Sequence, residues 1–328
     1  MKKPTIGITM GDPSGIGPEL IIKVLSQEAT FKSCNPFVIG DPTVMREASG
    51  VVGRELHISV IGDISEATFS YSRLDVLRPE GVDVQKIRWG RLDPAMGKAA
   101  ALCLEKACHM ALEKKLDGIV SAPLNKEAFH RAGYRYLDEL EFMREITHSP
   151  EASIMGVMDS IWTVAVTSHI PFRDIADSIK KDRVLKHIHL MDRTLKRVGF
   201  ADPRIAVAAL NVHGGEGGLI GREEIEEIEP AIEAAKKVNI KAQGPFPADT
   251  VFPRALSGEF NGVVCMYHDQ ANIARKLHPR RKGATIFMDL PVICGTTAHG
   301  TAFDIAGKGI ADPGSLQDAL KYTGLLSS

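Results

Sequence analysis

The 328-residue sequence predicts an α/β protein with two lobes, a largely parallel central sheet and an interdomain cleft. Short apolar runs bounded by glycine, proline or polar clusters alternate with amphipathic stretches of helical length. The chain is also longer than one hydrophobic core usually serves. Its 44% hydrophobic and 25% charged residues are ordinary for a globular protein, and they exclude a disordered, collagen-like or coiled-coil chain.

The predicted elements follow one another in the order of such a fold. Residues 5–10 predict a strand, and residues 18–25 predict a helix with proline in its first turn. A long helix over 98–116 leads into a strand at 118–120 and a polar loop at 121–126. Two further strands, 161–167 and 205–210, flank an amphipathic helix at 182–198, and a helix at 222–237 runs from acidic to basic, as the helix dipole favours.

Composition excludes several classes of partner. The net charge is −1, and no stripe of Lys and Arg interleaves with aromatic residues, so we expect no nucleic-acid partner. No apolar run approaches the roughly 20 residues that a membrane helix needs, so we expect no membrane partner and a cytoplasmic location. The five cysteines lack CxxC spacing, which argues against disulfides and a structural zinc site and fits a reducing compartment.

Three histidines directly follow apolar strands. They are His169, His213 and His268. Because the carboxyl ends of parallel strands meet at one edge of a sheet, where ligands bind, we expect these imidazoles to lie together. Three imidazoles suit Zn²⁺, Co²⁺ or Mn²⁺ and leave positions open for substrate oxygens. The alternative for each one is an ordinary hydrogen-bonded histidine.

Two glycine-rich segments are candidate cofactor sites. The first, GDPSGIGPE at 11–19, joins a strand to a helix, where backbone amides can meet an anion. The second, at 299–313, suits a loop wrapped around a flat ligand, with an aspartate for two ribose hydroxyls. A tight turn and a plain connector are the alternatives. The candidate residues are Gly11, Asp12, Gly15, Gly17, His299, Gly300, Thr301, Asp304 and Asp312.

Both segments resemble those of a known superfamily. The second resembles HGSAPDIAGKGIANP and the first resembles GDGIGPE, two motifs of the isopropylmalate and isocitrate dehydrogenases. Over nearly its whole length the chain is more similar to one branch, the 4-hydroxythreonine-4-phosphate dehydrogenase family. It shares GDPxGIGPE, a SHIPFRDIAD-like segment, NxHxGEGG, GPxPADTxF, YHDQ and HGTAxDIAGxGxAD with that family.

The resemblance implies an isopropylmalate-dehydrogenase-like fold, a homodimer with its active site near the interface, and one divalent metal (Zn, Mg, Co or Mn) bound by the three histidines. It implies NAD as cofactor, since Asp304 would repel a 2′-phosphate. The implied reaction oxidises a hydroxyl β to a carboxylate, and the β-keto acid then loses CO₂, with the metal favouring both steps. Lys276 matches an active-site lysine, and Asp249 is a further metal ligand or a residue that orients one. Lys126 is a candidate for binding the substrate.

The chain departs from the family at the substrate. Gly-His-Thr is replaced by Asp138, Glu139 and Leu140, and an asparagine and an arginine by Thr285 and Cys294. Losing an arginine removes a phosphate clamp, and added carboxylates repel a dianion. A cluster further along the chain, Arg280, Arg281 and Lys282, offers compensating charge.

We therefore expect an oxidative decarboxylase of a 4-phosphorylated hydroxy acid, either 4-phosphohydroxy-L-threonine or a threonate or erythronate phosphate. Alternatives are a dehydrogenase of an unphosphorylated hydroxy or dihydrodiol carboxylate, a metal hydrolase, and a non-catalytic metabolite-binding paralogue. The predicted domains are 1–128 with 283–328, on the cofactor side, and 129–282, for metal, substrate and dimerisation.

Overall fold

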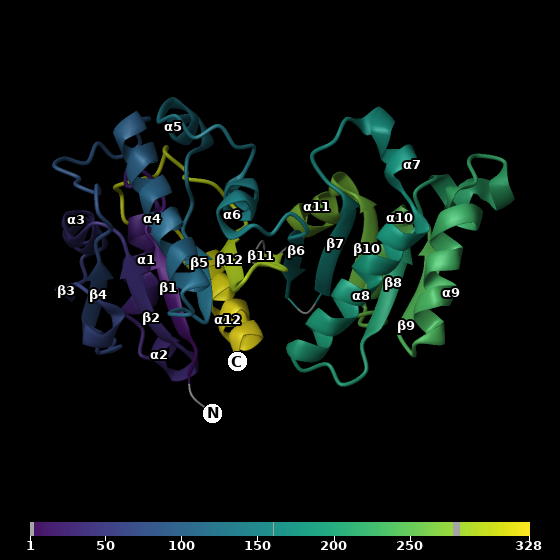
Figure 1. Cartoon of the computed structure of the whole chain (residues 1–328), viewed down its shortest axis with the longest axis horizontal. Coiled ribbons are helices and arrows are strands. Elements are labelled where there is room, and N and C mark those ends of the chain that lie inside the picture. The colour runs from purple at the N-terminus through teal and green to yellow at the C-terminus, as the bar shows by residue number, and fades with distance from the viewer. Residues whose placement is uncertain (1–2, 160, 278–282) are drawn as a thin grey trace. The chain divides into compact units, whose positions relative to one another are not determined.

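The computed structural model describes residues 3–159, 161–277 and 283–328, which pack as two compact units (Figure 1). The chain passes from the first unit to the second between Ser153 and Ile154, and returns to the first at Gly283. Residues 129–153, which the sequence-based boundary assigns to the second domain, pack with the first unit. The helices of this segment pack against the long helix that begins at Pro94, and an internal aromatic cluster, with the Phe129 and Phe142 rings 5.3 Å apart, holds the segment together.

Among the residues that the structure describes, the first unit contains seven neighbouring strands. All pairings between them are parallel except that of the last two. In spatial order the strands are β3 (His57–Ile61), β4 (Arg73–Leu77), β2 (Asn35–Ile39), β1 (Thr5–Thr9), β5 (Gly118–Ser121), β12 (Ile293–Thr297) and β11 (Ala284–Met288).

Helix starts in this unit follow the sequence closely. Asp41 and Asp93 each accept a hydrogen bond from a first-turn amide and precede a proline, the combination that favours helix initiation. The long helix therefore begins at Pro94, four residues before the predicted start. The helices are α1 (Gly17–Leu25), α2 (Thr30–Ser33), α3 (Pro42–Val52), α4 (Pro94–Leu112), α5 (Lys126–Arg131), α6 (Glu139–Thr147) and α12 (Gly314–Ser327).

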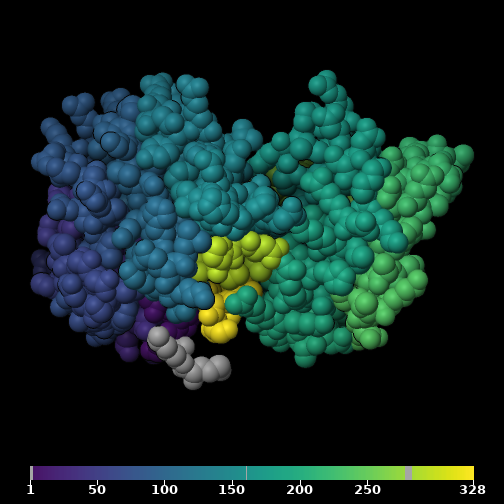
Figure 2. Space-filling view, in the orientation of Figure 1, coloured from purple at the N-terminus to yellow at the C-terminus, as the bar shows by residue number. Residues whose placement is uncertain are grey.

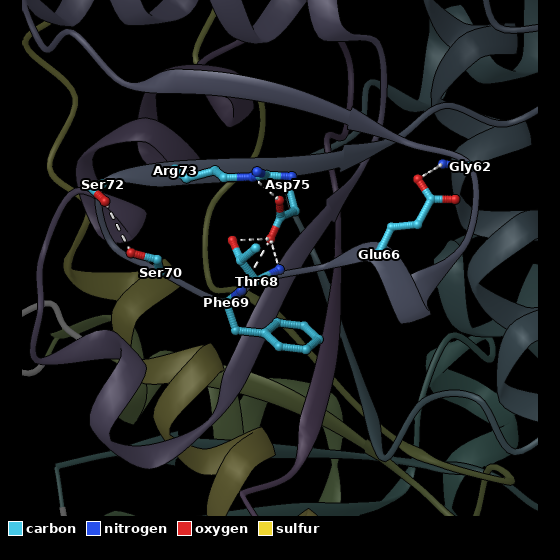
Figure 3. Close-up of polar contacts among 8 residues, drawn as sticks. All are labelled: Gly62, Glu66, Thr68, Phe69, Ser70, Ser72, Arg73 and Asp75. Carbon is cyan, nitrogen blue, oxygen red and sulfur yellow. Dashed lines mark hydrogen bonds and ion pairs between the residues drawn. The ribbon is translucent and has the colours of Figure 1, made fainter.

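A buried aspartate fastens the outer part of this sheet (Figure 3). One carboxylate oxygen of Asp75 accepts hydrogen bonds from the backbone amides of Thr68 and Phe69, at 2.7 and 3.1 Å. Its other oxygen faces Arg73 Nε at 2.9 Å. Asp75 thereby fixes the segment that follows the short helix η1 (Ile64–Glu66) against β4.

In the described part of the second unit there are five strands. β6 (Ser153–Met158) is antiparallel to β7 (Ile161–Thr167), and the parallel strands β10 (Gly262–Tyr267), β8 (Arg204–Ala208) and β9 (Lys241–Phe246) follow in that order. The helical segments are η2 (Phe172–Asp174), α7 (Ile175–Ser178), α8 (Lys181–Arg197), η3 (Val212–Gly218), η4 (Glu224–Ile228), α9 (Glu229–Lys237), α10 (Ala248–Leu256) and α11 (His268–Leu277).

Alternation along β10 assigns the helices of this unit to two faces of its sheet. Val263 and Cys265 pack with α10 and Ala271 of α11 in one apolar cluster, whereas Gly262 faces Met191 of α8. The predicted α/β fold with a largely parallel sheet is confirmed. His268 directly follows β10, as expected, and begins helix α11. Among the described residues, no helix is both long and apolar enough to cross a membrane.

Candidate functional site

The three predicted histidines follow three adjacent parallel strands of the second unit. β7, β10 and β8 are neighbours, and His169, His268 and His213 come just after their carboxyl ends. His169 and His268 lie together, with ring centroids 5.8 Å apart and planes tilted by 41°. All three residues are exposed.

His268 and His213 each have a carboxylate partner. Nδ1 of His268 lies 2.7 Å from Asp269 Oδ1, and Nδ1 of His213 lies 2.8 Å from Glu216 Oε1. A carboxylate on one ring nitrogen orients a histidine and raises its basicity, which leaves Nε2 to bind a metal. Sequence reasoning missed both carboxylates, although the His-Asp pair and the His-x-x-Glu spacing were visible.

The backbone near the site is locally strained. His169 has φ of 53°, and His213 and Glu216 each have φ of 48°. Non-glycine residues rarely adopt this left-handed conformation, and such outliers gather at functional sites. The His213 loop also has positive φ at Gly214 and Gly215. The strain therefore coincides with two of the three predicted ligands.

A buried carboxylate shapes the His213 loop. Glu224 Oε1 accepts hydrogen bonds from the backbone amides of Leu210 and Asn211, at 2.9 and 2.7 Å. Its Oε2 accepts another from the Asn211 side chain at 2.9 Å. A Cβ at Gly215 would lie 2.8 Å from Glu224 Oε2, so glycine permits this approach. The glycines of the NxHxGEGG motif thus serve the shape of the loop.

No group of three or more His, Cys, Asp or Glu side chains is arranged to hold a metal ion among the residues that the structure describes. His169 and His268 are close together, and the shared metal role of all three histidines stays a prediction. Asp249, in the first turn of α10, and Lys276, in α11, are exposed, and their catalytic roles stay predictions.

The second glycine-rich segment lies in the first unit and presents its aspartate outward. Asp304 is exposed, and Lys308 Nζ donates to its backbone oxygen at 2.7 Å. His299 and Gly300 are exposed too, and Asp312 Oδ1 accepts from Gly314 N at the start of α12. These positions are compatible with the predicted nucleotide contacts.

The first glycine-rich loop is arranged differently from the prediction. Gly11, Asp12, Gly15 and Gly17 are buried, as is Thr301. The backbone amides that were expected to meet an anion donate to carbonyl oxygens of the chain itself. Asp12 N donates to Pro123 O, Gly15 N to Asp12 O, and Ile16 N to Thr301 O. The loop supports the second segment, and direct contact between the loop and a cofactor stays a prediction.

Glu139 occupies the carboxyl edge of β5 and β12. Burial raises the pKa of its carboxyl to about 7, opposed by hydrogen bonds from the Thr296 and Ser121 hydroxyls and by the charge of Lys126. Thr296 and Ser121 are paired across the two parallel strands. The residue is partly exposed although its carboxyl is enclosed. Glu139 therefore lies at the boundary between the interior of the first unit and its surface.

The other departures from the family lie beside Glu139 or in the core. Thr285 pairs with Thr296 across β11 and β12, and Cys294 is close enough for the Glu139 charge to act on it. Burial first, and that charge second, raise the pKa of the Cys294 thiol well above its usual range. Cys294 and Leu140 are fully buried, so neither forms an open pocket wall in this structure. The predicted compensating cluster at 280–282 lies outside the described residues.

Comparison with known proteins agrees with this arrangement. The family model described as "Pyridoxal phosphate biosynthetic protein PdxA" matches residues 32–323. The chain belongs to this family. D-threonate 4-phosphate dehydrogenase of Cupriavidus necator is 42% identical over 323 residues, which cover 97% of this chain and 96% of the relative.

Solved structures support the same assignment. The 4-hydroxythreonine-4-phosphate dehydrogenase of Burkholderia phymatum has a TM-score of 0.84 and 38% identity, covering 99% of both chains. A β-decarboxylating dehydrogenase of Thermococcus kodakarensis, with a TM-score of 0.53 and 14% identity over 98% of this chain and 81% of its own, shares the fold. This PdxA-family member therefore has the fold predicted from its two glycine-rich motifs.

Proposed function

We propose that this chain is an NAD- and divalent-metal-dependent dehydrogenase that oxidises a CH–OH group of a 4-phosphorylated four-carbon hydroxy acid and releases CO₂ from the resulting β-keto acid. Threonate, erythronate and hydroxythreonine 4-phosphates are the candidate substrates. The observation that carries the proposal is the His169–His268 pair at adjacent strand ends in a member of this family. When bound, NAD accepts the hydride and the metal stabilises developing negative charge on oxygen.

The chain's own residues have separate tasks in this proposal. Nε2 of His169 and of His268 would hold the metal, with the Asp269 carboxylate orienting the His268 ring. Lys276 would pair with substrate or move a proton, and Asp304 would bind the ribose hydroxyls of NAD. The donor set fits Zn, Co or Mn, since imidazoles suit these ions.

We further propose that His213 completes the metal site across a homodimer. The His213 side chain is 64% exposed, and apolar neighbours accompany it, with Leu219 88% exposed and Val212 56% exposed. Figure 2 shows the surface of this part of the chain in green, at the right-hand edge of the view. Exposed apolar residues around a polar loop fit an interface between two copies.

Mixing two inactive variants tests the shared site. His213→Ala and His169→Ala should each be inactive alone, because each removes a ligand from every site. If His213 acts across the interface, mixed dimers contain one intact site and regain activity. Mixtures that stay inactive after verified subunit exchange would mean that His213 serves its own chain.

A second substrate class is favoured by one observation. Glu139 stands where the family has a histidine, so a group that can donate a hydrogen bond to phosphate is replaced by an acid. A site changed in this way would prefer a hydroxyl to a phosphate at that point. NADH formation with matched phosphorylated and unphosphorylated four-carbon acids decides between the classes.

A further inference from the structure

The second glycine-rich segment, at residues 299–313, is hydrogen-bonded to one face of α1. Gly307 N donates to Glu19 Oε1 at 2.5 Å. One turn further along α1, Lys23 Nζ donates to the backbone oxygens of Gly309 and Ala311, at 2.8 and 2.6 Å. Because residues four apart on a helix share one face, these two side chains hold the segment at three points.

Close packing fixes the depth at which the segment sits. Gly307 and Gly309 have φ of 78° and 67°, which disfavours any other residue. A Cβ would lie 2.5 Å from Trp89 Cγ at Gly307 and 2.6 Å from Val51 O at Gly309. At these two positions the backbone of the segment therefore packs against Trp89 and Val51 too closely for a side chain.

Burial of Glu19 indicates that this attachment is specific. Its side chain is fully buried, and among the described residues Oε2 has no hydrogen-bond partner while Oε1 holds Gly307. Burying a carboxylate away from water is energetically unfavourable. Among the described contacts, Glu19 contributes by holding Gly307, and with it the segment, in position. In the same segment, Asp304 is exposed and available to a ligand.

We propose that Glu19 and Lys23 are positioning residues that hold residues 304–311 in the geometry in which Asp304 receives the nucleotide. This inference rests on the proposed NAD dependence. A segment ordered before binding loses less conformational entropy when the ligand arrives, so removing the attachment weakens nucleotide binding. Chemistry at the histidines of the second unit should be little affected.

Lys23→Met and Lys23→Arg test the proposal, with Lys32→Met on the exposed surface of α2 as matched control. Lys23→Met should speed amide hydrogen exchange in peptides covering 304–311 and raise KM for NAD about tenfold, with kcat and KM for the acid within about twofold. Lys23→Arg keeps a cationic donor and should restore most of the affinity. Glu19→Gln keeps an oxygen acceptor for Gly307 and should have a smaller effect than Glu19→Leu.

Two results would overturn the positioning role. Lys23→Met could match the wild type in segment exchange and in KM for NAD, or it could lower the melting temperature and speed exchange throughout the first unit with KM for NAD unchanged. If Glu19→Leu fails to fold, the Lys23 variants still decide. Failure of the proposed function differs, because the wild-type protein itself then binds no NAD and both ideas fall.

Discussion

Asp12 should weaken the fold at high pH, and Asp12→Asn should relieve that effect. The residue is fully buried, one oxygen accepts from Ser14 N at 2.8 Å, and Oδ2 has no hydrogen-bond partner among the described residues. Burial raises the pKa of the Asp12 carboxyl to about 7, with the Ser14 amide opposing and the Asp93 charge adding to the rise.

The sign follows from the raised value. Stabilisation from the neutral form is fully present below the unfolded pKa of 3.8 and is lost as pH rises through about 7. That difference of roughly 3 pH units corresponds to about 4 kcal/mol in total, of which about 3 kcal/mol falls between about pH 5 and pH 8.5. Asparagine does not titrate, so the stability advantage of Asp12→Asn over wild type should grow by about 3 kcal/mol across that interval.

Urea unfolding at several pH values measures this growth. A constant cost of burying the new amide shifts the whole profile but leaves its slope unchanged. Asp63→Asn is the control without a slope in this interval, because backbone and hydroxyl hydrogen bonds from Ser65 lower the pKa of the exposed Asp63 carboxyl, which is therefore ionised throughout in both the folded and the unfolded state. Parallel profiles for Asp12→Asn and wild type, within about 0.5 kcal/mol, would refute the reasoning.

Other predictions concern single contacts. Asp75→Ala should lower the free energy of unfolding by about 2–4 kcal/mol in urea melts, because two amides and a guanidinium lose their acceptor; unchanged stability would contradict this. Glu216→Gln should weaken metal affinity about 10-fold or more in competition titrations, since the His213 ring loses its charged partner, and wild-type affinity would argue against metal binding there. Asp304→Ala should weaken NAD binding in titrations while metal content stays unchanged, and equal use of NADP by the wild type would defeat that assignment.

Sequence patterns predicted what depends on periodicity and strand order. The strand at Ile161–Thr167 and the placement of His169 and His268 at neighbouring strand ends follow from apolar runs and parallel topology. Burial could not be predicted in the same way. Asp12 lies in a glycine-rich loop whose amides were expected to meet an anion, yet the residue is fully buried, and distant segments accept from the loop amides, Pro123 O from Asp12 N and Thr301 O from Ile16 N.

The hydrogen-bond and charge partners of side chains could not be predicted from the sequence either. Nothing in the local pattern pairs Glu19 with Gly307, because that contact depends on how α1 meets a distant segment. Glu139 and Cys294 were identified separately as departures from the family, and only the fold makes them neighbours. Long-range packing therefore decides which of the predicted residues are open to ligands.

The most direct test of the central claim is NADH formation from D-threonate 4-phosphate by metal-loaded and chelator-treated protein. We predict NADH and CO₂ in equal amounts, with kcat/KM on the order of 10⁴ M⁻¹s⁻¹, loss of activity on chelation and recovery on adding back a divalent metal. No NADH from this or any other 4-phosphorylated four-carbon acid, or full activity in metal-free protein, would contradict the claim.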